Sequence, residues 1–193
     1  MEKKKKKKII YILQEIVIVA IGILIAVSIS NYKENVDNQK YIEKTLLAIE
    51  NEIKLSQTEV DSVLNRHIKL YEIIDNHIGS NEYTLSELIT SSGGFQVASI
   101  KNVSLRFFIS NKAELLEFQI ISQLLDIESQ TDILSDKIKR LADFVYDNLN
   151  ERNDEGKIKF YHLLADVIDG EQTLLESYSR LLDDNKIYIK KHK

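Results

Sequence analysis

The sequence predicts an all-α protein, in which one N-terminal transmembrane helix is followed by a long amphipathic helix and an antiparallel helical bundle. The chain of 193 residues contains no proline, the residue that most often interrupts a helix. Residues 9–29 are apolar at 17 of 21 positions. Beyond residue 40, apolar residues recur every three or four positions, which is the period of a helix with one buried face. This length allows one domain with its own core.

Residues 9–29 form a helix of about 31 Å, close to the ~30 Å thickness of a bilayer's hydrocarbon core. Six lysines precede this run, and positively charged flanks stay in the cytoplasm, where they attract anionic lipid head groups. The expected head-group contacts are Lys3, Lys4, Lys5, Lys6, Lys7 and Lys8. We therefore expect a cytoplasmic basic segment (1–8), a transmembrane helix (9–30) and an extracytoplasmic, periplasmic helical domain (31–193). The location would be the bacterial inner membrane, crossed once.

Two alternatives compete with the anchor. Ser28 and Ser30 imitate the small-x-small cleavage site of a signal peptide, but the apolar run is longer than the usual 7–15 residues. A buried core helix of a soluble protein would ordinarily have a polar face, and this run has none over six turns.

A group of residues in and after this run forms a recognisable pattern: Tyr11, Glu15, Ile16, Val17, Gly22 to Val27, Asn31 and Glu34. This pattern resembles the N-terminal signature of an uncharacterised family of small single-pass membrane proteins from Bacteroidetes-type bacteria. The sequence departs from that signature at Gln14, Ser30, Tyr32 and Lys33, where the family has Gly, Asn, Trp and Asn. The resemblance covers about 25 residues, and it implies a membrane anchor and a helical outer domain of unknown activity.

A stripe of small residues within the apolar run is a candidate helix-pairing face. Gly22, Ala26 and Ser30 recur every four residues, and Glu15 lies seven residues before Gly22, so all four fall on one side of a helix. Small residues at this spacing allow two transmembrane backbones to approach closely. A carboxylate in hydrocarbon costs on the order of 2 kcal/mol unless it is protonated, paired or reaches the lipid head groups. Homodimerisation and pairing with a different helix both remain open.

After the apolar run, the spacing of apolar residues predicts one long helix to about residue 78, ended by Gly79. Thr84 and Glu87 have the spacing of a capping box and predict a short helix through about residue 89. A loop is expected at residues 91–94. Residues 95–109 suit either short helical pieces or a strand-like run, and we favour short helices.

From residue 111 the helical pattern returns and continues to residue 149, with a polar cluster at residues 129–132 that could kink the helix. A turn at residues 153–156, a helix over residues 158–168 ending at Gly170, and a final helix over residues 171–189 complete the predicted bundle.

The sequence contains no motif typical of a cofactor or metal site, and we expect neither. The chain has no cysteine, no phosphate-binding glycine loop, no nucleophile elbow, and no Glu-x-x-His pair. His162 and Asp166, one helical turn apart, could share a metal or act as acid and base, but such pairs are usually solvated. His67 and His77 lie on the apolar seam of the long helix, where packed side chains are commoner than ligands. A net charge of −8 over residues 31–193 disfavours nucleic-acid binding.

These observations predict a membrane-anchored, extracytoplasmic helical binding or scaffolding module rather than an enzyme. Its expected partners are the lipid bilayer and either a membrane or periplasmic protein or a second copy of the chain. About eight cytoplasmic residues are too few to carry a signalling domain. Two alternatives stay open: a secreted protein cleaved from its leader, and a tethered enzyme with converging side chains. The candidate carboxylates for such an enzyme are Glu114, Glu117, Asp143 and Asp147.

Overall fold

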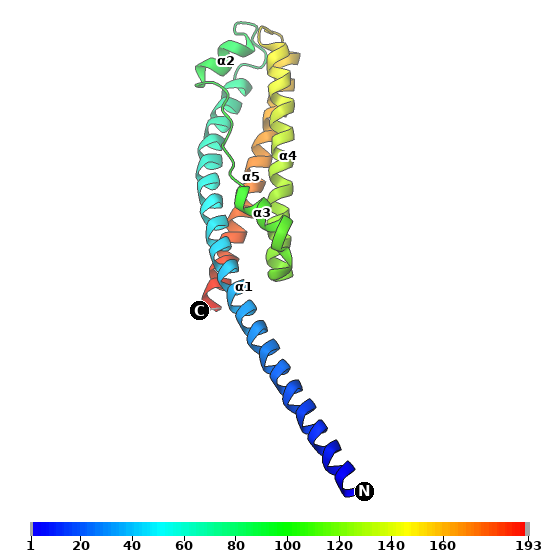
Figure 1. Ribbon diagram of the computed structural model, residues 1–193. Coiled ribbons are helices and arrows are strands. Elements are labelled where there is room, and N and C mark those ends of the chain that lie inside the picture. Colours follow the sequence, from blue (N-terminus) through cyan, green and yellow to red (C-terminus); the bar gives the residue numbers. More distant parts are fainter. Residues whose placement is uncertain (1, 192–193) are drawn as a thin grey trace. The chain divides into compact units, whose positions relative to one another are not determined.

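Helices make up the regular secondary structure of the described part of the chain. The computed structural model describes the backbone of residues 2–191 and the side chains of residues 11 and 13–183. Within that part it forms five α-helices, one short 3-10 helix and no β-strand, which confirms the predicted all-α class. The elements in Figure 1 are α1 (Glu2–Asp75), α2 (Leu85–Ser91), α3 (Val103–Lys112), η1 (Ala113–Leu115), α4 (Phe118–Asn148) and α5 (Asp154–Lys191).

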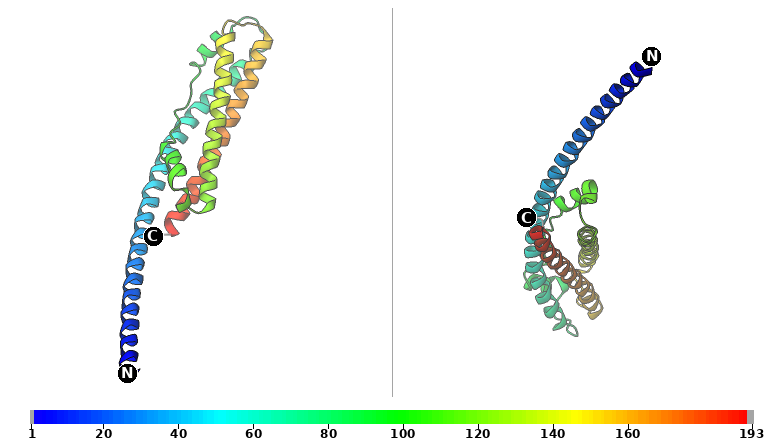
Figure 2. Two further views of the ribbon diagram at one scale, coloured as in Figure 1. Left: turned by 45° about the vertical axis from the view of Figure 1, so that its right-hand side comes forward. Right: turned by 90° about the horizontal axis from the view of Figure 1, so that it is seen from below.

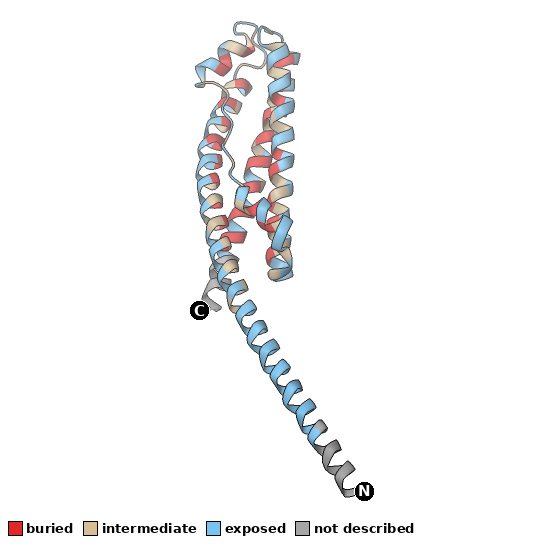
Figure 3. Cartoon of the chain, viewed as in Figure 1, coloured by how far each residue is buried: buried red, intermediate tan, exposed pale blue. Residues whose placement is uncertain are grey.

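Two compact units divide the chain, Met1–Lys44 and Thr45–Lys193. Helix α1 contributes to both units, and its backbone is helical without interruption between residues 30 and 45. In the first unit, every side chain of residues 13–35 is exposed (Figure 3). Because residues 16–29 are apolar around the whole circumference of the helix, none of their faces is set aside for packing within the chain.

Three long helices make up the second unit: residues 45–75 of α1, α4 and α5. Figures 1 and 2 show that α5 runs antiparallel to the other two, whereas α1 and α4 run in the same direction. As expected for an antiparallel bundle, a short connection, residues 149–153, joins α4 and α5. The parallel arrangement arises because residues 94–102, which we call the strap, run back along α1 as an extended segment before α3 begins.

The strap begins at two glycines with left-handed backbone conformations, Gly93 (φ 96°) and Gly94 (φ 88°), in the loop that the sequence predicted. The prediction of short helices over residues 95–109 is wrong for the first half of that range, because α3 starts only at Val103. The strap instead hydrogen-bonds to α1: the Ser56 hydroxyl accepts from the Lys101 amide (2.8 Å) and donates to the Lys101 carbonyl (3.2 Å). These contacts with α1 take the place of helical hydrogen bonds.

The start of α3 also depends on α1. Asn102 precedes α3 without capping it through its side chain. The Glu52 carboxylate instead accepts hydrogen bonds from the Ser104 amide (2.9 and 3.1 Å) and the Ser104 hydroxyl (3.0 Å). A carboxylate at this position is favourable because amide groups at a helix N-terminus are unpaired and carry partial positive charge.

The short helix α2 confirms the predicted capping box. The Glu87 amide donates to the Thr84 hydroxyl (3.2 Å), and the Thr84 amide donates to the Glu87 carboxylate (2.7 Å). The hydrogen bond from the Thr84 amide, followed by that from its hydroxyl, holds the pKa of Glu87 below its ordinary value. Helix α1 ends at Asp75, slightly before the predicted residue 78, and the turn after it includes Gly79 with a φ of 90°.

Buried residues of α1, α2, α3, α4 and α5 form the core of the second unit. Its fully buried apolar residues recur at helical spacing, and the largest are Phe108, Phe160, Tyr178, Leu46, Ile49, Ile53, Leu70, Ile74, Leu85, Leu105 and Leu124. Helix α4 continues through residues 129–132, where the buried Thr131 hydroxyl donates to the Ile127 carbonyl (2.8 Å).

Helix α5 corrects two predicted boundaries. It begins at Asp154, with the Asn153 side chain accepting from the Gly156 amide (2.8 Å), so Gly156 belongs to the first turn. The prediction that a helix ends at Gly170 is wrong, since α5 passes straight through it. A Cβ atom at Gly170 would lie 3.2 Å from Leu134 Cδ1 and 3.3 Å from Lys137 Cδ. This glycine therefore serves the close approach of α4 and α5 rather than a helix end.

Candidate functional site

The first candidate surface is the apolar part of α1. Within the described residues, α1 is the one helix long and apolar enough to cross a membrane, and its most apolar window has a mean hydropathy of 2.3 with no residue buried. A core helix of a soluble protein would bury much of such a window. Lys3 to Lys8 belong to α1, but their side chains lie outside the described ones. Their contact with lipid head groups stays a prediction.

The predicted pairing stripe is fully open. Because α1 is helical throughout, Glu15, Gly22, Ala26 and Ser30 share one side of it, and all four are exposed. No heavy atom of the structure lies within 4 Å of a Cβ built at Gly22. The Ser28 hydroxyl is bonded to the Leu24 carbonyl of its own helix (2.8 Å). Among the side chains that the structure describes, none therefore covers this stripe.

The most unusual cluster in the second unit surrounds His67. This histidine is 1% exposed. Its Nδ1 atom lies 2.9 Å from Oε1 and 3.0 Å from Oε2 of Glu171, a fully buried carboxylate on α5. Its Nε2 atom lies 2.9 Å from the carbonyl oxygen of Gln96 in the strap. The Phe95 ring stacks on the imidazole, with centroids 4.9 Å apart and planes 10° apart. The imidazole thus joins α1, α5 and the strap.

A second buried ionisable residue, Lys157, holds the end of α1. Its side chain is fully buried, and its ammonium donates to the carbonyl oxygens of His77 (3.3 Å) and Ser80. The neighbouring Asp154 carboxylate accepts from the Gly79 amide (2.8 Å). A cation is favourable at the carbonyl end of a helix, so the first turn of α5 caps α1. This arrangement is structural and leaves Lys157 no access to a substrate.

The buried polar groups continue at Tyr178, which is 1% exposed. Its hydroxyl makes no hydrogen bond of good geometry. Burial raises the pKa of Tyr178 to about 12, and the nearby Ser56 and Thr131 hydroxyls oppose that effect. A tyrosine in this environment stays neutral and packs as a large core residue.

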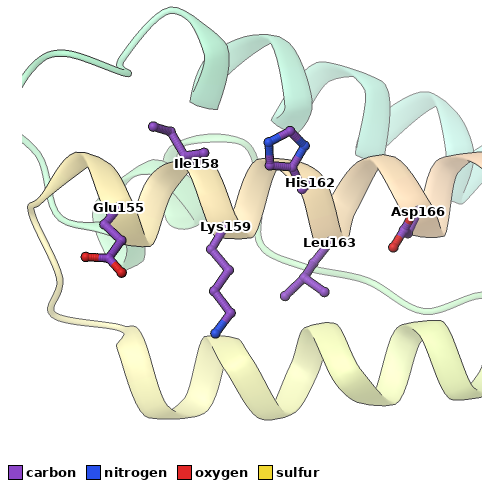
Figure 4. A pocket seen from close by; sticks show the side chains of 6 residues that line it. All are labelled: Glu155, Ile158, Lys159, His162, Leu163 and Asp166. Atoms are coloured by element: carbon purple, nitrogen blue, oxygen red, sulfur yellow. The ribbon is translucent and has the colours of Figure 1, made fainter.

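The predicted acid–base candidates do not converge. Glu114, Glu117, Asp143 and Asp147 are all exposed. His162 and Asp166 are also exposed, and in the described part of the chain no hydrogen bond or ion pair joins them. Figure 4 shows their side chains pointing in different directions. No group of three metal-binding side chains occurs among the described residues.

The hollow that contains His162 is shallow. It has a volume of about 590 Å³, is open to solvent, and is lined only by side chains of α5: Glu155, Ile158, Lys159, His162, Leu163 and Asp166. The Lys159 ammonium lies 5.2 Å from the centroid of the Phe144 ring on α4, a cation–π contact. A small-molecule site normally encloses its ligand with groups from several elements, and this hollow does not.

His77, the other histidine of the apolar seam, is half-buried and bonds locally. Its Nδ1 atom lies 2.7 Å from the Ile73 carbonyl oxygen, and its ring meets the Tyr83 ring edge-on at 5.2 Å. The remaining histidine, His192, lies outside the described residues.

Sequence reasoning found His67 but missed its partner Glu171. A signal for Glu171 does exist, because it falls in register with the buried residues Leu164, Val167, Leu174 and Tyr178 of α5. A carboxylate at a core position of an amphipathic helix predicts a buried partner. In comparisons with protein-family models, with curated proteins and with solved structures, the chain has no match.

Proposed function

We propose that this protein is a membrane-anchored helical binding or scaffolding module of the bacterial inner membrane. Its N-terminus lies inside and its bundle, residues 45–183, lies in the periplasm. The observation that carries the proposal is the apolar segment of α1, none of which is buried by the rest of the chain. A surface this apolar requires lipid or another apolar partner. The lysine block before it favours the inside orientation.

The packing of the bundle interior supports a binding role for the bundle. The core is filled with apolar side chains, and the buried ionisable residues His67, Glu171 and Lys157 are engaged in contacts between elements. The exposed carboxylates considered for a tethered enzyme do not line the hollow that contains His162. Protein–protein contacts through the bundle surface or the stripe at Gly22 are the activity that we propose. Membership of the family that the N-terminal residues resemble stays a prediction.

Topology is tested by fusing a reporter that is active only outside the cytoplasm to Lys193. We expect activity in whole cells and retention of the chain in the membrane fraction. A reporter active only in the cytosol, or a mature chain that begins near Asn31 and is soluble, would contradict the anchor.

The binding role is tested by photo-crosslinking in intact cells, followed by purification in mild detergent. A crosslinking residue replaces Phe118 (84% exposed) or Tyr146 (83% exposed) in separate variants, and Ala26 in a third. We expect a discrete adduct of constant mass from at least one position. Recovery of the monomer alone from all three would count against scaffolding. The adduct mass distinguishes a second copy of this chain from another protein.

A further inference from the structure

Both ring nitrogens of His67 face hydrogen-bond acceptors. Nδ1 faces the Glu171 carboxylate at 2.9 and 3.0 Å, and Nε2 faces the Gln96 carbonyl oxygen at 2.9 Å. A neutral imidazole has one N–H and one lone pair, so it can donate to only one of them. A carbonyl oxygen never donates. Satisfying both contacts therefore requires one proton more than a neutral imidazole and a carboxylate carry together.

That additional proton can lie on either side of the Nδ1–Glu171 hydrogen bond. In one arrangement an imidazolium donates to the carboxylate, and in the other a protonated Glu171 donates to Nδ1. In both, Nε2–H donates to Gln96 and the buried pair has no net charge. With the side chains of His67 and Glu171 each 1% exposed, water does not substitute for a missing partner.

Removal of the proton has a directed effect. The remaining N–H stays on Nδ1, because a hydrogen bond to a carboxylate is about twice as strong as one to a neutral carbonyl. The Nε2 lone pair then faces the Gln96 oxygen lone pairs at 2.9 Å. The contact between the imidazole and the strap becomes repulsive, while the contact between α1 and α5 persists.

We propose that His67 and Glu171 form a proton-dependent latch that fastens the strap to α1 and α5. When a base in solution takes the proton, the His67–Gln96 bond breaks and this part of the strap loosens. Glu171 of α5 is the titratable group that faces the imidazole, and Arg66 of α1 bonds the Gln96 side chain. Among the described residues, the hydrogen bonds and ion pairs of the imidazole go to Glu171 and to the Gln96 carbonyl oxygen.

A spin label tests the latch in the full chain reconstituted in lipid nanodiscs. The chain has no cysteine, so Val97→Cys, at an exposed strap position (56% exposed) next to Gln96, provides a unique attachment point. We expect the mobile fraction of the label to rise about tenfold when alkaline titration removes the proton from the pair. A label at Ile133→Cys on α4 (44% exposed) should not respond.

Glu171→Gln separates the latch from simple packing. The Gln amide N–H is a permanent donor to Nδ1, which leaves Nε2–H for Gln96, so the strap label should stay immobile at every pH. His77→Gln, at a histidine that bonds its own helix, should retain the wild-type pH response. An unchanged pH response in folded Glu171→Gln would overturn the proposal.

Two measurements on the wild type do not depend on these variants folding. Nitrogen NMR of the histidine rings should show Nε2 of His67 protonated while the strap label is immobile, with a shared or full proton at Nδ1. A strap label that stays immobile after NMR shows that the pair has lost its proton would refute the latch. An Nε2 without a proton in the folded chain, with the strap label immobile, would also refute it.

Discussion

Two stretches of the same helix differ in how their apolar side chains are used. In α1, residues 13–35 are exposed at every position, whereas residues 46–74 bury one face, with Leu46, Ile49 and Ile53 each at most 2% exposed. The backbone conformation is the same in both. The difference lies in the arrangement of apolar residues, which cover the whole circumference over residues 16–29 of the first stretch and only one seam of the second.

This contrast shows which surroundings each stretch is built for. Packing one face against the rest of the chain does not cover a helix that is apolar on all sides, so such a helix is stable only in apolar surroundings. A helix with one apolar seam is stable in water once that seam is covered. The seam of α1 also carries Ser56 and His67, whose polar atoms bind the strap. Specific contacts therefore occur in residues 46–74, which we call the outer stretch. Residues 13–35, which we call the inner stretch, can serve as an anchor without such contacts.

Charges placed in the inner stretch should have the largest effect. We expect the double substitution Ile21→Asp with Leu24→Asp to release the chain from membranes, because each charge at mid-bilayer costs roughly 2.5–3.5 kcal/mol. The measurement is the fraction of chain left in the pellet after an alkaline wash of membranes. Leu47→Asp, at a 44% exposed position of the outer stretch, is the control and should remain in the pellet. Equal retention of the wild type, the double variant and Leu47→Asp in the pellet would show that the inner stretch is not an anchor.

Truncating isoleucine at matched positions of α1 should affect only the outer stretch. Ile53 is 2% exposed and Ile23 is 59% exposed. We expect Ile53→Ala to lower the free energy of unfolding of the bundle by about 2–5 kcal/mol, since it leaves a cavity. Ile23→Ala should leave it unchanged. Denaturant unfolding in detergent, followed by circular dichroism, measures both. A loss of stability from Ile23→Ala would reveal packing against the inner stretch that the structure does not contain.

Much of this fold is predictable because helical periodicity is local. The apolar spacing is sufficient to find α1, α4 and α5, and the capping residues Thr84 and Glu87 locate α2. The strap was missed because its apolar residues suit short helices, and only hydrogen bonds to α1, more than 40 residues away for Ser56 and Lys101, hold it extended. The predicted helix end at Gly170 was wrong because sequence alone does not distinguish a glycine at a close contact between helices from a glycine that ends a helix.

The buried polar sites were half predictable. His67 lies on the apolar seam of α1 and Glu171 on that of α5, so each could be expected to be buried. That they meet depends on the relative register of two helices 104 residues apart in sequence, which periodicity does not determine. The third partner, the Gln96 carbonyl, belongs to the backbone, so the pattern of side chains in the sequence does not predict its role.

Alkaline pH should destabilise the bundle through Tyr178. Its pKa is raised by burial to about 12 from an ordinary value of 10, so the folded chain keeps a proton that the unfolded chain loses. This stabilisation is complete below about pH 10 and is lost as the pH rises towards 12, by an amount on the order of 2 kcal/mol. We expect Tyr178→Phe to be less sensitive to that change in denaturant unfolding at matched pH values.

A second tyrosine titrates in the same window and supplies the control. The pKa of Tyr161 is raised to about 12, mainly by its hydrogen bond with Tyr71. Tyr161→Phe should therefore leave the contribution of Tyr178 in place. If Tyr178→Phe loses stability between pH 10 and pH 12 as steeply as the wild type does, the buried hydroxyl is not the cause.

Substitution of one glycine in each region should give the smallest difference in the free energy of unfolding. A Cβ at Gly170 would lie 3.2 Å from Leu134 Cδ1, whereas Gly22 has nothing within 4 Å. We expect Gly170→Val to lower the free energy of unfolding by about 1 kcal/mol, the low end of overpacking effects, because the neighbouring atoms belong to side chains that can shift. Gly22→Val should not destabilise the bundle, and if the stripe pairs with another helix, it should reduce crosslinking from Ala26. Equal free energies of unfolding for the two variants would mean that the α4–α5 contact tolerates a larger side chain. In Gly22→Val, an unchanged crosslinked adduct from position 26 would place the partner on another face of α1.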